Sequence, residues 1–294
     1  YRRLDYTIGG TDKNRNPLNV SDQLDFFNPK LGISYQLSEN SSFYTSFAVA
    51  NKEPNRDDYV NAPVSTVPKS ENLQDIEAGY RLGTQNISAG INGFAMFYKD
   101  QLVLTGKVND VGEYIRQNVP DSYRAGVELE GRWQISNQLS WAATAALSRN
   151  KIKNFTEYVD DYDTGIQIRN DYKSTDIAFS PAFIGSNELS YKPFRNVEMA
   201  VLSKYVSKQY LDNTSKNDRI INPFFVNDLR LGYNTSFKGV KNIGLTLLVN
   251  NILGEEYETN GYTFSYVYDA AFTTENFYYP QAKQNFLLSL NLKF

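Results

Sequence analysis

Cysteine and histidine are both absent from the 294 residues of this chain. Without them the chain cannot form a disulfide, a cysteine nucleophile, a Ser-His-Asp triad, a Cys/His zinc site or an axial-histidine haem site of its own. Strong charge of one sign is also missing, because 30 basic and 33 acidic residues leave a net charge of −3. Nucleic acid is therefore not expected as a partner, since phosphate binding needs a basic surface.

Long hydrophobic runs are missing as well. The sequence has no stretch of about 18 apolar residues, which a transmembrane helix would need, and its mean hydropathy is −0.50. A membrane β-barrel is still possible, because its strands alternate apolar and polar residues and average to a polar value. Aromatic residues are abundant instead. The chain contains 22 Tyr and 18 Phe, residue types that are typical of strands and interfaces.

Apolar residues recur at every second position through most of the chain, which predicts strands rather than helices. The last residues show this most clearly, since Phe286, Leu288 and Leu290 share one face with Leu292 and Phe294. Similar alternation occurs at 31–37, 76–82, 127–135, 197–201 and 243–249. We count about eleven such strands and a possible further one at 2–8.

Short and long connections alternate between these strands. The short turns fall at 38–41, 83–86, 136–138, 192–196 and 238–242. The long connections fall near 51–72, 99–122, 150–180, 207–223 and 251–284. This order predicts strands that run up and down with all tight turns at one end, as in an up-and-down barrel rather than a Greek-key sandwich.

The two faces of the strands differ in charge. Charges of both signs lie on the polar face: Glu128, Glu130, Arg132, Glu198, Lys204, Asp228 and Arg230. The other face is nearly free of charge, so it is expected to meet lipid or a dry core. Aromatic residues flank the tight turns, for example Trp133 and Trp141, which indicates either an interfacial girdle or ordinary cross-strand packing.

Several stretches resemble the C-terminal barrel region of TonB-dependent outer-membrane receptors. Residues 251–257 (Asn-Ile-Leu-Gly-Glu-Glu-Tyr) resemble the family's penultimate-strand signature, and 284–294 resemble its closing strand with a terminal aromatic, Phe294. Residues 27–35, followed by 42–44, resemble a mid-barrel hairpin. Residues 71–80 and 126–130 resemble the hairpin and the strand that come after it. The resemblance covers nearly the whole chain, in order.

The resemblance implies an all-β fold: an antiparallel up-and-down transmembrane β-barrel of 22 strands, plugged by an N-terminal domain. Residues 1–294 would form the C-terminal portion, about half of that barrel with 11–12 strands. The plug and its energy-coupling box are absent, and the chain starts with Tyr1 and no secretory signal, so we expect a piece of a longer protein. Its open edges should prevent it from working in a membrane alone.

The function implied by the resemblance is energy-coupled uptake of a scarce nutrient, such as an iron–siderophore, across the cell outer membrane. The implied partners are outer-membrane lipid, the missing plug and barrel half, TonB through the plug, and a small-molecule substrate. Phe294 would serve as the barrel assembly signal. No enzyme activity, cofactor or metal is implied. Two alternatives stay open: a smaller passive porin or outer-membrane enzyme, and a soluble sugar-binding β-protein.

Two connections could contact a ligand. The connection 251–284 is rich in aromatic residues, among them Tyr257, Tyr262, Phe264, Tyr266 and Tyr268. Exposed aromatic side chains bind flat or sugar-like ligands at low entropic cost, although these residues could instead pack between loops or form a girdle. The connection 51–72 is the second candidate and offers Arg56, Asp58 and Tyr59.

Two groups of acidic residues could indicate a catalytic pair or a calcium site, but each has a simpler structural interpretation. Glu128 and Glu130 lie on one strand face about 7 Å apart, a separation found in inverting glycosidases; lining of a barrel interior explains them better, because other strands repeat the pattern. The acidic stretch 160–165 could offer oxygen ligands to calcium, but it lacks the later glutamate of a calcium loop, so a solvated loop is the favoured interpretation.

Overall fold

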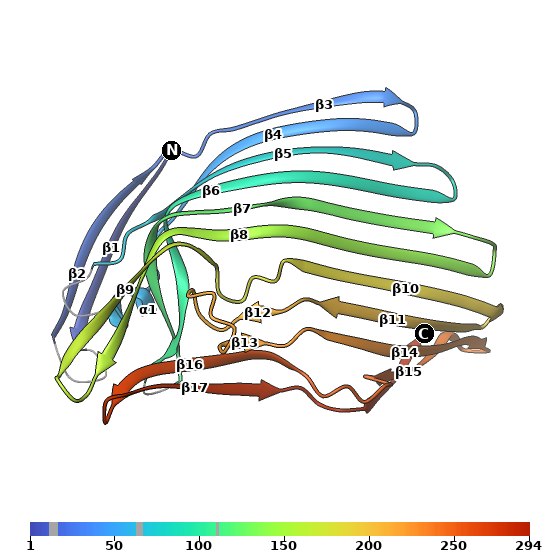
Figure 1. The fold of residues 1–294 in the computed structure, drawn as a ribbon. Coiled ribbons are helices and arrows are strands. Elements are labelled where there is room, and N and C mark those ends of the chain that lie inside the picture. The colour runs from blue at the N-terminus through green and yellow to red at the C-terminus, as the bar shows by residue number, and fades with distance from the viewer. Residues whose placement is uncertain (12–16, 63–66, 110–111) are drawn as a thin grey trace.

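The computed structural model describes residues 1–11, 17–62, 67–109 and 112–294. It is an open, curved sheet with the form of a partial barrel (Figure 1). Eleven strands follow one another as antiparallel neighbours in chain order: β3 (Lys30–Ser38), β4 (Ser41–Lys52), β5 (Glu71–Gly83), β6 (Ile87–Val108), β7 (Tyr114–Gln134), β8 (Leu139–Asp161), β10 (Phe183–Phe194), β11 (Val197–Val206), β14 (Phe224–Phe237), β15 (Val240–Asn250) and β18 (Asn285–Lys293). The predicted number of spanning strands is confirmed.

The remaining elements lie at the end of the sheet that carries the long connections (Figure 1). They are the hairpin β1 (Arg2–Thr11) and β2 (Pro17–Phe26), the helix α1 (Arg56–Val60), the strand β9 (Ile166–Asp176), the short pair β12 (Gln209–Tyr210) and β13 (Ile220–Ile221), and the hairpin β16 (Glu258–Tyr268) and β17 (Ala271–Pro280). Among the described residues, no helix combines the length and the apolar character needed to cross a membrane.

All five predicted tight turns lie at one end of the sheet, and the long connections lie at the other (Figure 1). The long connections are not irregular loops, however. Strands β6, β7 and β8 contain 22, 21 and 23 residues, about twice what a tilted membrane-spanning strand needs. Their outer halves continue as paired strands, because pairing satisfies the backbone groups of a long connection.

The two faces of the sheet have the predicted polarity. On the convex face the apolar rows are open to the surroundings, with Leu129 48% and Leu290 61% exposed. On the concave face Glu130 and Glu188 line a groove with Arg132. The leucines are therefore not packed inside a β-sandwich, and the apolar face does not form the dry core that was the other expectation for it.

The aromatic residues beside the tight turns lie on the same convex face as these leucines. Trp133 pairs across the strands with Trp141, and Tyr35 pairs with Phe43, and all four side chains are exposed. Exposed aromatic side chains next to an apolar band are typical of a membrane–water interface.

Buried apolar side chains gather at the loop end rather than in the middle of the sheet. One cluster contains Val103, Val119, Ile152, Phe155 and Ile177 from the outer halves of β6, β7 and β8 and the connection after β9. This location follows from the open barrel shape, since the middle of the sheet has an aqueous concave side and no opposing layer. Strands β3 and β18 end the main path, and each pairs on one side only within the described chain. Such edges need further strands for closure in lipid.

Candidate functional site

Four long segments from distant parts of the chain pack together at the loop end. Strand β16 pairs in parallel with the tip of β8, through Tyr266 with Asp160 and Val267 with Asp161. The same strand also contacts β6 and β13. The outer halves of β6 and β8, the β12–β13 segment and the β16–β17 hairpin therefore enclose a common interior, which we call the loop assembly.

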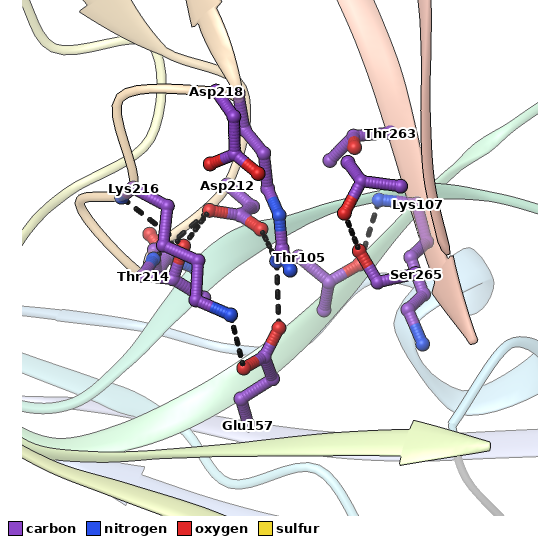
Figure 2. A network of polar contacts seen from close by, with 12 residues as sticks. Thr105, Lys107, Glu157, Asp212, Thr214, Lys216, Asp218, Thr263 and Ser265 are labelled. Carbon is purple, nitrogen blue, oxygen red and sulfur yellow. Dashed lines mark hydrogen bonds and ion pairs between the residues drawn. The ribbon is translucent and has the colours of Figure 1, made fainter. Parts of the chain in front are cut away.

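An ionic cluster of Glu157, Asp212, Lys216 and Arg219 lies inside the loop assembly (Figure 2). Glu157, Asp212 and Arg219 are buried, and Lys216 is half-buried. The Nη1 atom of Arg219 donates to Oε1 of Glu157 and to Oδ2 of Asp212, each at 2.6 Å. Lys216 Nζ is 3.6 Å from Oε2 of Glu157, and the Tyr172 hydroxyl donates to that same oxygen at 2.9 Å. The arginine is 1% exposed. The cluster thus joins β8, β9 and the β12–β13 segment.

This cluster lies on the outer half of β8, beyond the part of the strand that carries the apolar band. Its contacts determine the protonation states of its side chains. Burial raises the pKa of Glu157, but the hydrogen bonds and charges of Arg219, with Tyr172 and Lys216 beside them, outweigh burial and hold this pKa below its ordinary value. Burial and the hydrogen bond to Glu157 raise the pKa of Tyr172 to about 12. At neutral pH the carboxylate is therefore ionised and the phenol is a neutral donor.

The turn that presents Asp212 and Arg219 is built by a run of small polar residues. Asp212 Oδ1 accepts from the backbone N–H of Thr214 at 3.0 Å and from its hydroxyl at 2.6 Å. Asn213 is fully buried; its amide donates to the carbonyl of Leu104 at 2.7 Å and accepts from the N–H of Ala178 at 2.8 Å. Asp, Asn and Thr favour such turns because their side chains replace backbone partners.

A cavity of about 280 Å³ adjoins the cluster. Polar side chains that line it include Thr105, Lys107, Thr263 and Ser265 (Figure 2). Gln117 lines it as well. Arg219 also lines it, and the Nε and Nη2 atoms of this arginine are buried and have no hydrogen-bond partner within the described chain. Buried N–H donors of a guanidinium favour oxygen acceptors, so the cavity suits water or an oxygen-bearing group.

The predicted aromatic residues of the connection 251–284 lie in two separate places. Tyr262 stacks on Phe277 with ring centroids 4.9 Å apart and meets Phe264 edge-on at 5.6 Å. Tyr266 follows on the same strand and lies 5.7 Å from the ring of Tyr162. Neighbouring Tyr268, at the hairpin tip, is 64% exposed. These four predicted residues therefore form one row along β16.

Tyr257 lies apart from this row. Its ring packs on Phe224 with centroids 4.6 Å apart, and it lines a groove of about 630 Å³ on the concave face. Charged side chains from four strands line the same groove: Glu130, Arg132, Glu188, Lys204 and Asp228. Arg230 Nη2 lies 2.5 Å from Oε1 of Glu188. The groove is a polar wall suited to a hydrated passage. Glu130 lines both this groove and a second hollow of about 510 Å³, and Glu128 lines the second one.

Two of the three predicted residues of the connection 51–72 make hydrogen bonds or ion pairs within the fold. Residues 63–66 of that connection lie outside the described residues. Asp58 and Asn55 form a capping box at the start of α1, and Arg116 Nη1 lies 3.4 Å from the Asp58 carboxylate. Tyr59 is buried and donates to Asp22 Oδ2 at 2.9 Å. Only Arg56 keeps an exposed side chain.

The acidic stretch 160–165 uses its carboxylates for backbone hydrogen bonds. Asp161 Oδ1 accepts from the N–H groups of Asp163 and Thr164. The two oxygens of Asp163 accept from Asp269 N at 2.9 Å and Ala270 N at 2.7 Å. Over the described residues, no group of three or more carboxylate, histidine or cysteine side chains is placed to hold a metal ion. Asp163 instead ties the β8–β9 tip to the β16–β17 tip.

Replacement of Asp163 by alanine is expected to loosen the β16–β17 tip. Two charge-assisted hydrogen bonds are lost from an exposed site, so hydrogen exchange at the amides of Asp269 and Ala270 should accelerate about tenfold. Asp160→Ala is the matched control, because Asp160 accepts only a side-chain hydrogen bond from Gln167 in the described chain. Equal exchange in the two variants would show that Asp163 does not hold the tip.

The ionic cluster was not foreseen from the sequence. Glu157 and Arg219 are 62 residues apart, and neither belongs to a recognisable motif. The one available signal was the polar run 212–215, which indicates a tight turn but not its partner.

The chain matches a family model described as TonB dependent receptor-like, beta-barrel, over residues 2–252. A search of curated proteins finds no match. Among solved structures, the siderophore receptor PiuA from Acinetobacter baumannii is 19% identical, with a TM-score of 0.71 over 97% of this chain and 38% of that protein.

Two further solved structures are similar. The unliganded ferric citrate transporter FecA is 18% identical, with a TM-score of 0.67 over 96% of this chain and 40% of that protein. The ferric yersiniabactin uptake receptor FyuA from Yersinia pestis is 18% identical, with a TM-score of 0.62 over 90% of this chain and 38% of that protein. The chain therefore spans about two fifths of the length of these receptors, and the likeness establishes the fold.

Proposed function

The chain belongs to the TonB dependent receptor-like β-barrel family, and from that premise we propose that it is the loop-bearing part of a receptor for energy-coupled uptake of a scarce nutrient. Proteins of this family are outer-membrane receptors and transporters rather than enzymes. The proposed substrate is a small metal chelate such as an iron–siderophore. The names of the similar structures, which include siderophore receptors, a ferric citrate transporter and a copper transporter, support this class.

One structural observation carries the proposal. The long segments collect at one end of a half-barrel whose convex face is apolar and whose concave face is charged. This arrangement suits a receptor that captures a ligand at the loop end and passes it along a hydrated inner wall. The remaining strands and the plug would come from the rest of the protein, and TonB would act through the plug. No catalytic residue is proposed.

The proposed substrate contacts are the aromatic row Tyr262, Phe264, Tyr266 and Tyr268, with Tyr257 lower on the concave wall. Aromatic rings offer large contact areas with few rotatable bonds, which favours binding of planar chelating groups. Arg56 is a further proposed contact, since its side chain is exposed, unlike those of Asp58 and Tyr59 in the same connection. Asp58 and Tyr59 are proposed to hold the α1 segment rather than to bind the substrate directly.

The test of function is uptake by a strain that lacks the whole gene. We expect growth on one class of iron chelate to fail under iron limitation, to return when the full-length gene is supplied, and to fail again when TonB is removed. Uptake that continues without TonB would contradict the proposal and favour a passive pore.

The triple replacement of Tyr262, Tyr266 and Tyr268 by alanine in the full-length receptor is expected to weaken substrate binding about tenfold or more. Each buried aromatic contact contributes roughly 0.5–1.5 kcal/mol beyond its area. Equilibrium binding of the transported chelate measures the change. The control is the triple alanine variant of Tyr35, Tyr191 and Tyr233, which are exposed at the turn end. Unchanged affinity in the first variant would remove the row from the site.

A further inference from the structure

Arg219 uses only one nitrogen of its guanidinium for the ionic cluster. Its Nη1 atom donates to both Glu157 and Asp212, while Nε and Nη2 are buried and have no partner among the described residues. Nε and Nη2 together form one edge of the planar group, and their N–H bonds point in parallel from that edge. Such an edge matches two oxygens of a carboxylate, a sulfate or a phosphate. The described chain therefore leaves the oxyanion-binding edge of a buried arginine unused.

The acidic groups beside this edge are already neutralised. Glu157 and Asp212 are the two carboxylates that line the cavity of about 280 Å³, and both accept from Arg219. Lys216 Nζ lies 3.6 Å from the Glu157 carboxylate, and Lys107 lines the cavity from β6. The cluster and the cavity thus contain three cations and two carboxylates, which leaves a net charge of +1. An anion that enters this cavity meets no unpaired carboxylate among the described residues.

Further donors line the cavity. The hydroxyls of Ser265 and Thr274 are 3.1 Å apart, so one donates to the other; when Thr274 donates, the proton of Ser265 is left for a third group. Ser265 lies beside the ionic cluster (Figure 2). The side chains of Lys107 and Gln117 also line the cavity, and neither makes a hydrogen bond or an ion pair with another described residue. The unused donors therefore come from β6, β7, β16 and the β12–β13 segment.

The edge of Arg219 is covered in this conformation. Nε and Nη2 are both buried. The Phe272 ring of β17 lies 5.9 Å from Cζ of Arg219 and 4.9 Å from Nζ of Lys216, so the β16–β17 hairpin lies against the cluster. We expect an oxyanion to reach the edge through a small shift of this hairpin. Because Ser265 belongs to the same hairpin, a bound anion would then hold the hairpin in place.

The cavity is separate from the aromatic row on β16. Successive side chains of a strand point to opposite faces. Thr263 and Ser265 are buried and line the cavity, so Tyr262, Phe264 and Tyr266 belong to the other face of β16. A substrate bound on the aromatic row would therefore lie across the strand from the cavity. This separation favours a free ion, rather than a group of that substrate, as the occupant.

We propose that this cavity binds a small free oxyanion of the phosphate or sulfate type, held by the Nε–Nη2 edge of Arg219. Lys107, Gln117 and the Ser265 hydroxyl complete its contacts. The four oxygens of a tetrahedral anion can face donors from several segments at once, which the single centre of a halide ion does less well. Bound there, the anion links β6, β7, β16 and the β12–β13 segment and stabilises the loop assembly.

The experiment adds inorganic phosphate to the full-length receptor in neutral detergent and follows hydrogen exchange at 209–221 and 258–268. We expect saturable protection of these amides by phosphate, and none by chloride at the same ionic strength. Arg219→Lys keeps a positive charge beside Glu157 but removes the two-donor edge. The phosphate concentration at half-protection should therefore rise at least about tenfold in this variant.

Lys107→Gln is the second variant, because it removes a cation of the cavity without removing any contact within the described chain. It keeps the loops folded, as unchanged exchange without phosphate would show, and should raise the half-protection concentration about threefold or more. The matched control is Lys283→Gln, which removes an exposed lysine outside the cavity and should behave like the wild type.

Three results would overturn the proposal: no saturable protection by phosphate, equal protection by chloride, or wild-type concentrations in both cavity variants. Displacement of phosphate by the transported chelate would assign the edge to the substrate and overturn the assignment to a free ion. Phosphate binding is measured on the purified receptor without uptake, so its failure leaves the proposed transport function untouched.

Discussion

Replacement of Arg219 by alanine is expected to destabilise the loop assembly by about 3–5 kcal/mol, because removal of one partner leaves buried charges without compensation. Glu157 and Asp212 each accept from the same Nη1 atom, and both carboxylates are nearly buried. The side chain of Arg219 also lies 5.9 Å from the Phe272 ring of β17. Its loss therefore affects three segments at once.

Hydrogen exchange in the full-length receptor measures this effect, since local opening is resolved at individual amides. Amides at 209–221 should exchange at least about a hundredfold faster in Arg219→Ala, while amides in the middle of β14 keep their rates. Arg169→Ala is the control, because the exposed pair of Arg169 and Asp171 should contribute less than about 1 kcal/mol. Exchange at 209–221 that matches the control would show that the ionic cluster does not hold the loops.

Replacement of Leu129 by arginine is expected to destabilise the barrel by about 2–4 kcal/mol, because its side chain points from the convex face toward the middle of the lipid. Leu129 pairs with Ala145 and Ile91, so an arginine there has no acidic neighbour on its own face among these partners. Unfolding of the full-length receptor by urea in lipid vesicles measures the change in the free energy of unfolding.

The matched control is Thr144→Arg, on the strand next to Leu129 but on the concave face. Thr144 lines the polar groove and pairs with Glu130, so an arginine there meets water and a carboxylate. The cost at this position should stay below about 1 kcal/mol. Equal costs for the two arginines would mean that the convex face does not meet lipid, and would contradict the membrane assignment of the whole sheet.

The spanning part of the barrel was predictable from the sequence because its cause is local. A strand that meets lipid on one side and water on the other must alternate in polarity, as Val127 to Trp133 do against Glu128 to Arg132. The tight turns were visible for the same reason, since Gly, Asn and Ser mark them at fixed distances from each strand. The β16–β17 hairpin was missed although aromatic residues alternate with Thr263 and Ser265 along β16. In β17 both faces contain polar and aromatic residues, which hides the period of two in that strand.

The strands, the turns between them and the face that each side chain occupies could be predicted from the amino-acid sequence, since all three depend on neighbours a few residues away. The contacts between loop residues became visible only in the folded chain. Arg219 reaches Glu157 across 62 positions, and Asp163 reaches Ala270 across 107. The curvature of the sheet determines these partners, because it brings the ends of distant strands together. This curvature cannot be predicted from the pattern of residues within a single strand.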